Sequence, residues 1–180
     1  MRFSQPGEQP SRQSPDYAEL VERFPGPVAI ACAPPAGSIA LCGYESSDGH
    51  PWAVEVTYAL AGRDLLRVRT VRGSVDWTPV IRGTESLAGN LGVLGLPGDP
   101  DAPETPTSVT VDGTPMAGTR IDLPDLSGVR LEWREQHVFC IGDPRQIDAV
   151  ELRSATGADF ARLCAEFEDF VARRRAERGY

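Results

Sequence analysis

The sequence contains no lysine, and all eighteen of its cationic side chains are arginines. A lysine Schiff base, a lysine general base and the lysine of a phosphate-binding loop are therefore excluded as sources of activity. Complete replacement of lysine by arginine is typical of codon bias in a GC-rich genome, so we expect a bacterial source.

Long apolar runs are also lacking. No stretch approaches the roughly 20 apolar residues that span a bilayer, and the N-terminus lacks the apolar core of a signal peptide. We therefore expect a cytoplasmic protein whose four cysteines are reduced thiols. The net charge of -8 disfavours binding to nucleic acids and to anionic membranes, because both carry negative charge.

Metal-binding motifs are missing as well. Histidine occurs only twice, and no close Cys-x-x-Cys or His-x-x-x-His pair is present, although structural zinc sites favour such spacings. We predict no metal site and no cofactor. The thiols of Cys32, Cys42, Cys140 and Cys164 are then expected to be small apolar packing groups.

What the sequence does contain is a pattern of short strands. Sixteen prolines and eighteen glycines indicate many turns. Residues 52–60 alternate apolar and polar side chains, as do parts of 64–72 and 129–134, and this period of two indicates half-buried strands. Asp112-Gly113 predicts a type I′ hairpin turn. We predict an α+β fold with a meander-like antiparallel sheet of about seven or eight strands, the last over 147–152.

Two helices should flank this sheet. Ser14-Pro15-Asp16 has the composition of a helix start and predicts a short N-terminal helix. Near the other end, Thr156 and Asp159 have the spacing of a capping box. The apolar residues that follow recur at helical spacing, which predicts a long amphipathic C-terminal helix packed on the sheet. They are Phe160, Leu163, Cys164, Phe167, Phe170 and Val171.

The expected organisation is one domain over residues 14–180, preceded by a flexible tail over residues 1–13. An acidic, proline-rich loop occupies residues 97–106. The glycine-rich segment 89–98 does not have the Gly-x-Gly-x-x-Gly spacing of a dinucleotide-binding turn. We interpret it as a turning loop rather than a phosphate site.

Catalytic combinations are few. Cys42 and His50 flank a short turn, so they are the candidates for a cysteine nucleophile with a histidine base. The alternative is that His50 is a solvated loop residue. His137 and Cys140 are three residues apart on an expected strand, which sends their side chains to opposite faces. We predict that the protein is not an enzyme, and Cys42 and His50 are the residues that would carry the alternative.

Two groups of arginines are candidate binding residues. Arg67 and Arg69 share one face of a strand, where pairing with Glu55 on the neighbouring strand is the alternative to ligand binding. Arg173, Arg174, Arg175 and Arg178 crowd the end of the last helix, where cations also complement the helix dipole.

These observations favour a non-enzymatic interaction or accessory protein whose partner is another protein. The negative net charge points to a basic partner. A small-ligand-binding domain is the alternative, with Trp52, Tyr58, Trp77 and Trp133 as possible walls of a cavity. A cysteine-dependent hydrolase or transferase using Cys42 and His50 is the third hypothesis. The oligomeric state and the strand order are not predicted.

Overall fold

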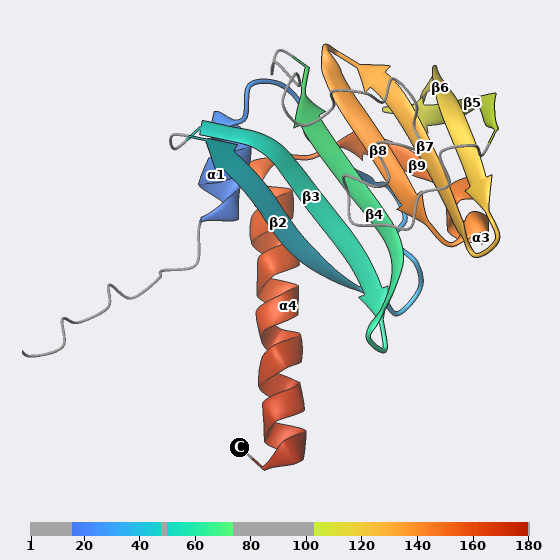
Figure 1. The fold of residues 1–180 in the computed structure, drawn as a ribbon. Helices are drawn as coiled ribbons and strands as arrows, with labels where there is room; N and C mark the ends of the chain where they lie inside the picture. Colours follow the sequence, from blue (N-terminus) through green and yellow to red (C-terminus); the bar gives the residue numbers. More distant parts are fainter. Residues whose placement is uncertain (1–15, 48–49, 74–102, 180) are drawn as a thin grey trace, which may run out of the picture.

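The computed structural model describes residues 16–47, 50–73 and 103–179. These residues form an α+β fold built on one curled sheet of nine strands, slightly more than the seven or eight predicted. The elements are α1 (Tyr17–Arg23), β1 (Ala29–Ala31), β2 (Ile39–Ser47), β3 (His50–Leu60), β4 (Arg63–Arg72), β5 (Glu104–Val111), β6 (Thr114–Leu123), β7 (Leu126–Trp133), β8 (Gln136–Gly142), α3 (Pro144–Asp148), β9 (Glu151–Ser154) and α4 (Gly157–Arg178). Figure 1 shows α1 and α4 together on one side of the sheet.

The strand order is β1-β9-β5-β6-β7-β8-β4-β3-β2. All pairs are antiparallel except β5 with β9. The predicted meander is present in β2-β3-β4 and in β5-β6-β7-β8, whereas β1 pairs with β9 rather than with its sequence neighbour β2. The predicted tail and the proline- and glycine-rich loops lie largely or wholly outside the described residues.

Local signals explain most of the turns and helix ends. Asp112 and Gly113 have φ angles of 50° and 75°, which confirms the predicted type I′ turn. The capping box at the start of α4 is also present: Asp159 N–H donates to Thr156 Oγ1 at 3.2 Å, and Thr156 N–H donates to Asp159 Oδ2 at 2.9 Å. The predicted strand over 147–152 was wrong in its first half. Asp143 caps the short helix α3 instead, and β9 begins only at Glu151.

The main core fills the concave face of the sheet. Val56, Val68 and Cys140 have no exposed surface there, and Phe160 of α4 packs against them with 0% exposure. The N-terminal half of α4 thereby closes the concave face next to β2. None of the helices in the described part of the chain is long and apolar enough to cross a lipid bilayer.

The curl of the sheet brings β1 over the strands near the opposite end. Ala29 N–H donates to Thr70 Oγ1 on β4 at 2.9 Å, and Ala31 N–H donates to the Tyr58 hydroxyl on β3 at 3.2 Å. Both hydroxyl-bearing residues are buried. Two backbone donors of β1 are thus satisfied by side chains from across the concave face.

Candidate functional site

The strand β2 forms the other end of the sheet. Within the described residues its hydrogen-bonded neighbour is β3 alone, so one side of its backbone has no ladder partner there. The strand is nine residues long and contains no proline. Its register shifts between Glu45 and Ser46, which leaves Ile39 to Tyr44 as a regular edge. An exposed edge of this kind is a template for pairing with another strand.

A groove of about 310 Å³ runs beside this edge, between β2, α1 and α4. Two apolar side chains of β2 are exposed on its two opposite faces: Leu41 is 40% exposed and Tyr44 is 39% exposed. Tyr17 of α1 stacks edge-to-face on Tyr44, with ring centroids 6.0 Å apart. The residues that line the groove are Tyr17, Ala40, Leu41, Cys42, Cys164, Phe167 and Glu168.

The groove contains a pair of thiols. Cys42 of β2 and Cys164 of α4 interact through their side chains. Burial, together with the neighbouring sulfur of Cys164, raises the pKa of Cys42 to about 12. Burial also raises the pKa of Cys164 and of Tyr17. All three groups are therefore neutral at physiological pH, and the thiols behave as apolar groove-lining groups rather than as nucleophiles.

The structure does not bring Cys42 and His50 together. Cys42 pairs with Val56, whereas His50 pairs with Ser47, five residues further along β2. At a strand rise of about 3.3 Å per residue, roughly 16 Å separates the two positions. A thiol and an imidazole at that distance cannot share a proton, so the proposed nucleophile and base do not form a catalytic pair.

The rim of the groove is acidic. Glu168 lines the groove, and the charges of Glu168 and Asp16 add to the effect of burial in raising the pKa of Cys164. Among the described residues, none that lines the groove is cationic. The site therefore combines an apolar floor, an aromatic wall and negative charge at its edge.

The predicted arginine stripe on β4 is already paired with carboxylates. Arg67 lies 3.6 Å from Glu55 and 3.1 Å from Asp64. Arg69 lies 2.6 Å from Glu45 and 3.5 Å from Glu55, and its guanidinium stands 5.6 Å from the centre of the Trp52 ring. Pairing with Glu55, the alternative weighed for this stripe, is the arrangement found.

The four arginines of the last helix have a different setting. Arg173, Arg174, Arg175 and Arg178 are all exposed at the C-terminal end of α4. Arg174 lies 3.3 Å from Glu177 and stacks over the Phe170 ring at 5.5 Å. These residues lie beyond the groove, on the part of α4 that extends past the sheet (Figure 1).

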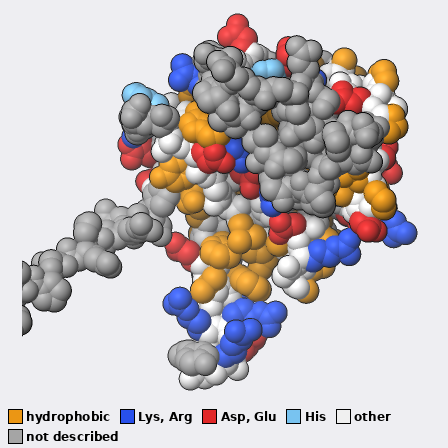
Figure 2. Space-filling model, viewed as in Figure 1, with side chains coloured by type: hydrophobic (Ala, Val, Ile, Leu, Met, Phe, Trp, Pro, Cys, Tyr) orange, Lys and Arg blue, Asp and Glu red, His pale blue; other side chains and the backbone are white. Residues whose placement is uncertain are grey.

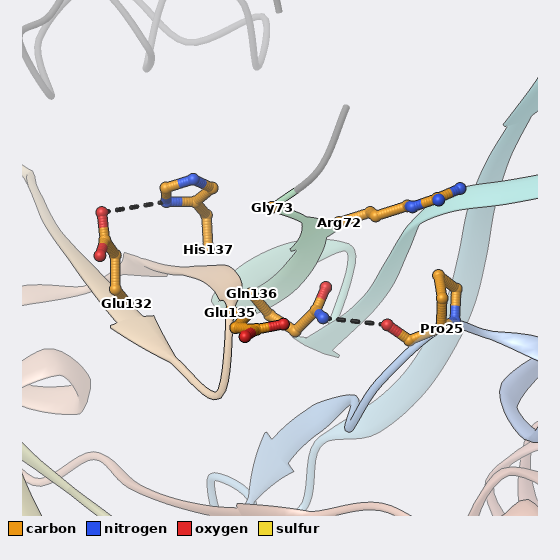
Figure 3. A pocket seen from close by; sticks show the side chains of 7 residues that line it. All are labelled: Pro25, Arg72, Gly73, Glu132, Glu135, Gln136 and His137. Atoms are coloured by element: carbon orange, nitrogen blue, oxygen red, sulfur yellow. Dashed lines mark hydrogen bonds and ion pairs between the residues drawn. The ribbon is translucent and has the colours of Figure 1, made fainter. Parts of the chain in front are cut away.

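A second hollow of about 600 Å³ lies near the start of β8 (Figure 3). Gln136 Nε2 donates to the carbonyl of Pro25 at 3.0 Å, and His137 Nδ1 lies 4.0 Å from Glu132. His137 lines this hollow, whereas Cys140 is buried in the main core, so the two lie on opposite faces as predicted. Figure 3 shows Gln136 reaching across to Pro25, while His137 and Glu132 face each other on the other side of the hollow.

The aromatic residues considered as walls of a ligand cavity are used for packing. Tyr58 and Trp133 are 1% and 4% exposed and belong to the main core, and Tyr58 also bonds to β1. Trp52 packs against a second cluster of buried residues, and Trp77 lies outside the described residues. No three potential metal-ligating side chains come together within the described ranges.

Comparison with known protein families and with curated proteins finds no match to this chain.

Proposed function

We propose that this chain is a non-enzymatic protein-interaction domain that binds an extended segment of a partner protein along β2. The observation that carries the proposal is the combination of a regular sheet edge, unpaired among the described residues, with a groove directly beside it. Backbone hydrogen bonds to the edge would supply affinity, and the groove would select side chains. The edge and the groove together support this function better than either would alone, because one would supply affinity and the other selectivity.

The period of a strand determines how such a segment would sit. Successive side chains of an added strand point to opposite faces, so every second one would enter the groove. An apolar side chain there would contact Tyr17 and Phe167, which are both partly buried in the free protein. Covering these two surfaces would contribute on the order of 25 cal/mol for each Å² removed from water.

The charge of the groove suggests the rest of the partner's chemistry. Glu168 and Asp16 would attract lysine or arginine beside the apolar position. The net charge of -8 acts in the same direction, because it steers a basic segment towards the domain. We therefore propose a partner segment in which apolar and basic residues alternate or adjoin.

A small apolar ligand is the second candidate. The groove volume of about 310 Å³ lies at the lower end of the range for small-molecule sites. The unpaired edge of β2 favours the peptide, because a small ligand would leave those backbone groups unused.

The test is selection of extended peptides from a random displayed library on the immobilised full chain. We expect enriched peptides to combine apolar with basic residues and to bind at least tenfold more weakly to the variant Leu41→Arg. The matched control is Leu60→Arg, because Leu60 is 44% exposed, similar to Leu41 at 40%, but does not line the groove.

Amide hydrogen exchange locates the bound peptide. Addition of a strand should slow exchange in residues 39–44, since the free backbone groups of β2 would then be hydrogen-bonded. Equal binding to the Leu41→Arg and Leu60→Arg variants would count against the groove. Failure to enrich any peptide family, with the domain folded, would count against the proposed function itself.

A further inference from the structure

The C-terminal half of α4 leaves the body of the protein. The last buried residue of the helix is Leu163, and residues 172–178 are all exposed. Figure 1 shows this half extending past the ends of β2, β3 and β4. We call residues 166–178 the arm.

One face of the arm is apolar. Phe167, Phe170 and Val171 are only partly buried and lie on one side of the helix, as their spacing of three and four residues requires. Figure 2 shows hydrophobic side chains on this part of the surface next to a group of arginines. Apolar residues of this size on an extended helix are typical of a helix-pairing face.

The charges beside this face follow a regular order. Glu166 is followed seven residues later by Arg173 on one flank of the apolar face, and Glu168 by Arg175 on the other. Seven residues are close to two helical turns, so the members of each set lie in line along the helix. All four side chains are exposed. Each flank therefore carries an acid towards the sheet and an arginine towards the tip.

We propose that the arm binds the arm of a second copy of this chain in antiparallel orientation. Reversal of the second helix places the acid of each flank opposite the arginine of the same flank. Glu166 then faces Arg173 of the other copy, and Glu168 faces Arg175, with both relations repeated by the two-fold axis. Parallel pairing would not bring these charges together.

The same register fills the centre of the contact. With the two-fold axis between Phe170 and Val171, Phe170 of one copy packs on Val171 of the other. Phe167 of one copy then faces Arg174 of the other, a pairing for which the stacking of Arg174 on Phe170 within one chain is already a precedent. Apolar contacts occupy the middle and charged pairs occupy the rim, as in protein interfaces generally.

The charged groups are available for this contact. Glu166 lies 2.8 Å from Arg162, but both side chains are more than half exposed, at 57% and 54%. Exposed pairs of this kind contribute little to stability, so Glu166 can exchange its partner at small cost. Because the arm is short, the dimer should be weak and should depend on protein concentration and on salt.

The test is a charge exchange in the full chain, measured by analytical ultracentrifugation over a range of protein concentrations. One variant, Arg173→Glu with Arg175→Glu, makes the arm acidic. The other, Glu166→Arg with Glu168→Arg, makes it basic. Each variant alone should associate at least tenfold more weakly than the wild type, because like charges then face each other.

The mixture of the two variants is the decisive sample. Every facing pair is again of opposite charge, so the mixture should form a heterodimer of near wild-type strength, identified by native mass spectrometry. All four positions are exposed and remain helix-forming residues, and circular dichroism checks that each variant folds. If the variant with the acidic arm misfolds, Arg173→Gln with Arg175→Gln replaces it and should also weaken association.

A wild-type chain that stays monomeric up to its solubility limit would overturn the inference. Unchanged association of either variant on its own would also overturn it. So would a mixture of the two folded variants that does not form the heterodimer. The variant with the acidic arm retains every groove-lining residue and should keep peptide binding. Loss of the dimer and loss of the proposed function are therefore separate results.

Discussion

The two edge strands of the sheet differ in length, burial and hydrogen bonding. At one end, β1 is three residues long, fully buried, and its outward N–H groups at Ala29 and Ala31 bond to hydroxyls of the concave face. At the other end, β2 is nine residues long and exposes Leu41 and Tyr44. Within the described residues, no strand beyond β3 pairs with it.

This difference indicates how the protein manages its edges. Proteins usually protect edge strands by shortening, covering or charging them, because free edges pair with other chains. Here the β1 edge is protected by length, burial and side-chain bonding, while most of β2 carries no such protection. The open edge lies beside the groove, which is the arrangement that recognition by strand addition uses.

The largest expected effect on stability comes from removing the two hydroxyls that bond to the backbone of β1. The double variant Tyr58→Phe with Thr70→Val removes both hydroxyls and leaves two buried N–H donors of β1 without partners. We expect the free energy of unfolding to fall by about 3 kcal/mol, because each unsatisfied buried donor costs about 1–3 kcal/mol. Urea denaturation measures the change. Thr57→Val, on the partly exposed face of β3, is the control and should change stability little; equal losses in both would contradict the role assigned to the hydroxyls.

A smaller effect on stability is expected from the ion pair that joins β9, the neighbour of β1, to α4. Arg153 donates to both carboxylate oxygens of Asp159 at 2.6 and 2.9 Å, and Asp159 also completes the cap of α4. Asp159→Asn should lower stability at neutral pH by about 1 kcal/mol, in line with lost helix caps. The exposed Asp169→Asn on the same helix is the matched control.

The pH dependence of this effect has a defined sign. The Arg153 guanidinium holds the pKa of Asp159 well below its ordinary value of 3.8. A depressed pKa contributes stability that is fully present above pH 3.8 and is lost as the pH falls through the lower, folded value. The difference in the free energy of unfolding between the wild type and Asp159→Asn should therefore become smaller as the pH falls below about 4. A difference that grew under acid would refute the assignment.

The smallest effect on stability is expected at the open edge. Leu41→Arg changes a side chain that is 40% exposed and removes no hydrogen bond that holds the sheet together. We expect its free energy of unfolding to stay within about 0.5 kcal/mol of the wild type. Thermal unfolding followed by circular dichroism measures this. A large loss of stability would mean that Leu41 supports the fold. The contrast between β1 as a structural strand and β2 as a binding strand would then be wrong.

Much of the fold could be predicted from local patterns. The strand over residues 52–60, with its alternation over 54–59, the Asp112-Gly113 turn and the capped C-terminal helix were all confirmed, because each depends on neighbouring residues alone. The helix α3 was missed. Asp143-Pro144 signalled a turn, but the same residues also form a helix start, and a short apolar segment does not distinguish a helix from a strand.

The candidate site was less accessible to sequence reasoning. Cys42 and Cys164 both fell on apolar faces, yet no pattern indicated that the last helix would cover β2 rather than another strand. Cys42 and His50 were close in sequence but lie at different points of the β2–β3 ladder. Sequence proximity across a hairpin was a poor guide, because a ladder separates residues at the rate of the strand rise.

The sequence alone determined the α+β class, the period of each main strand, the cap and apolar face of the last helix, and the order of charges along it. These properties depend on interactions within a few residues. Only the tertiary structure decided that β1 joins β9, that β1 is closed by Thr70 and Tyr58, and that β2 is left as an edge beside α4. Strand order depends on contacts between segments far apart in the chain, which local composition does not encode.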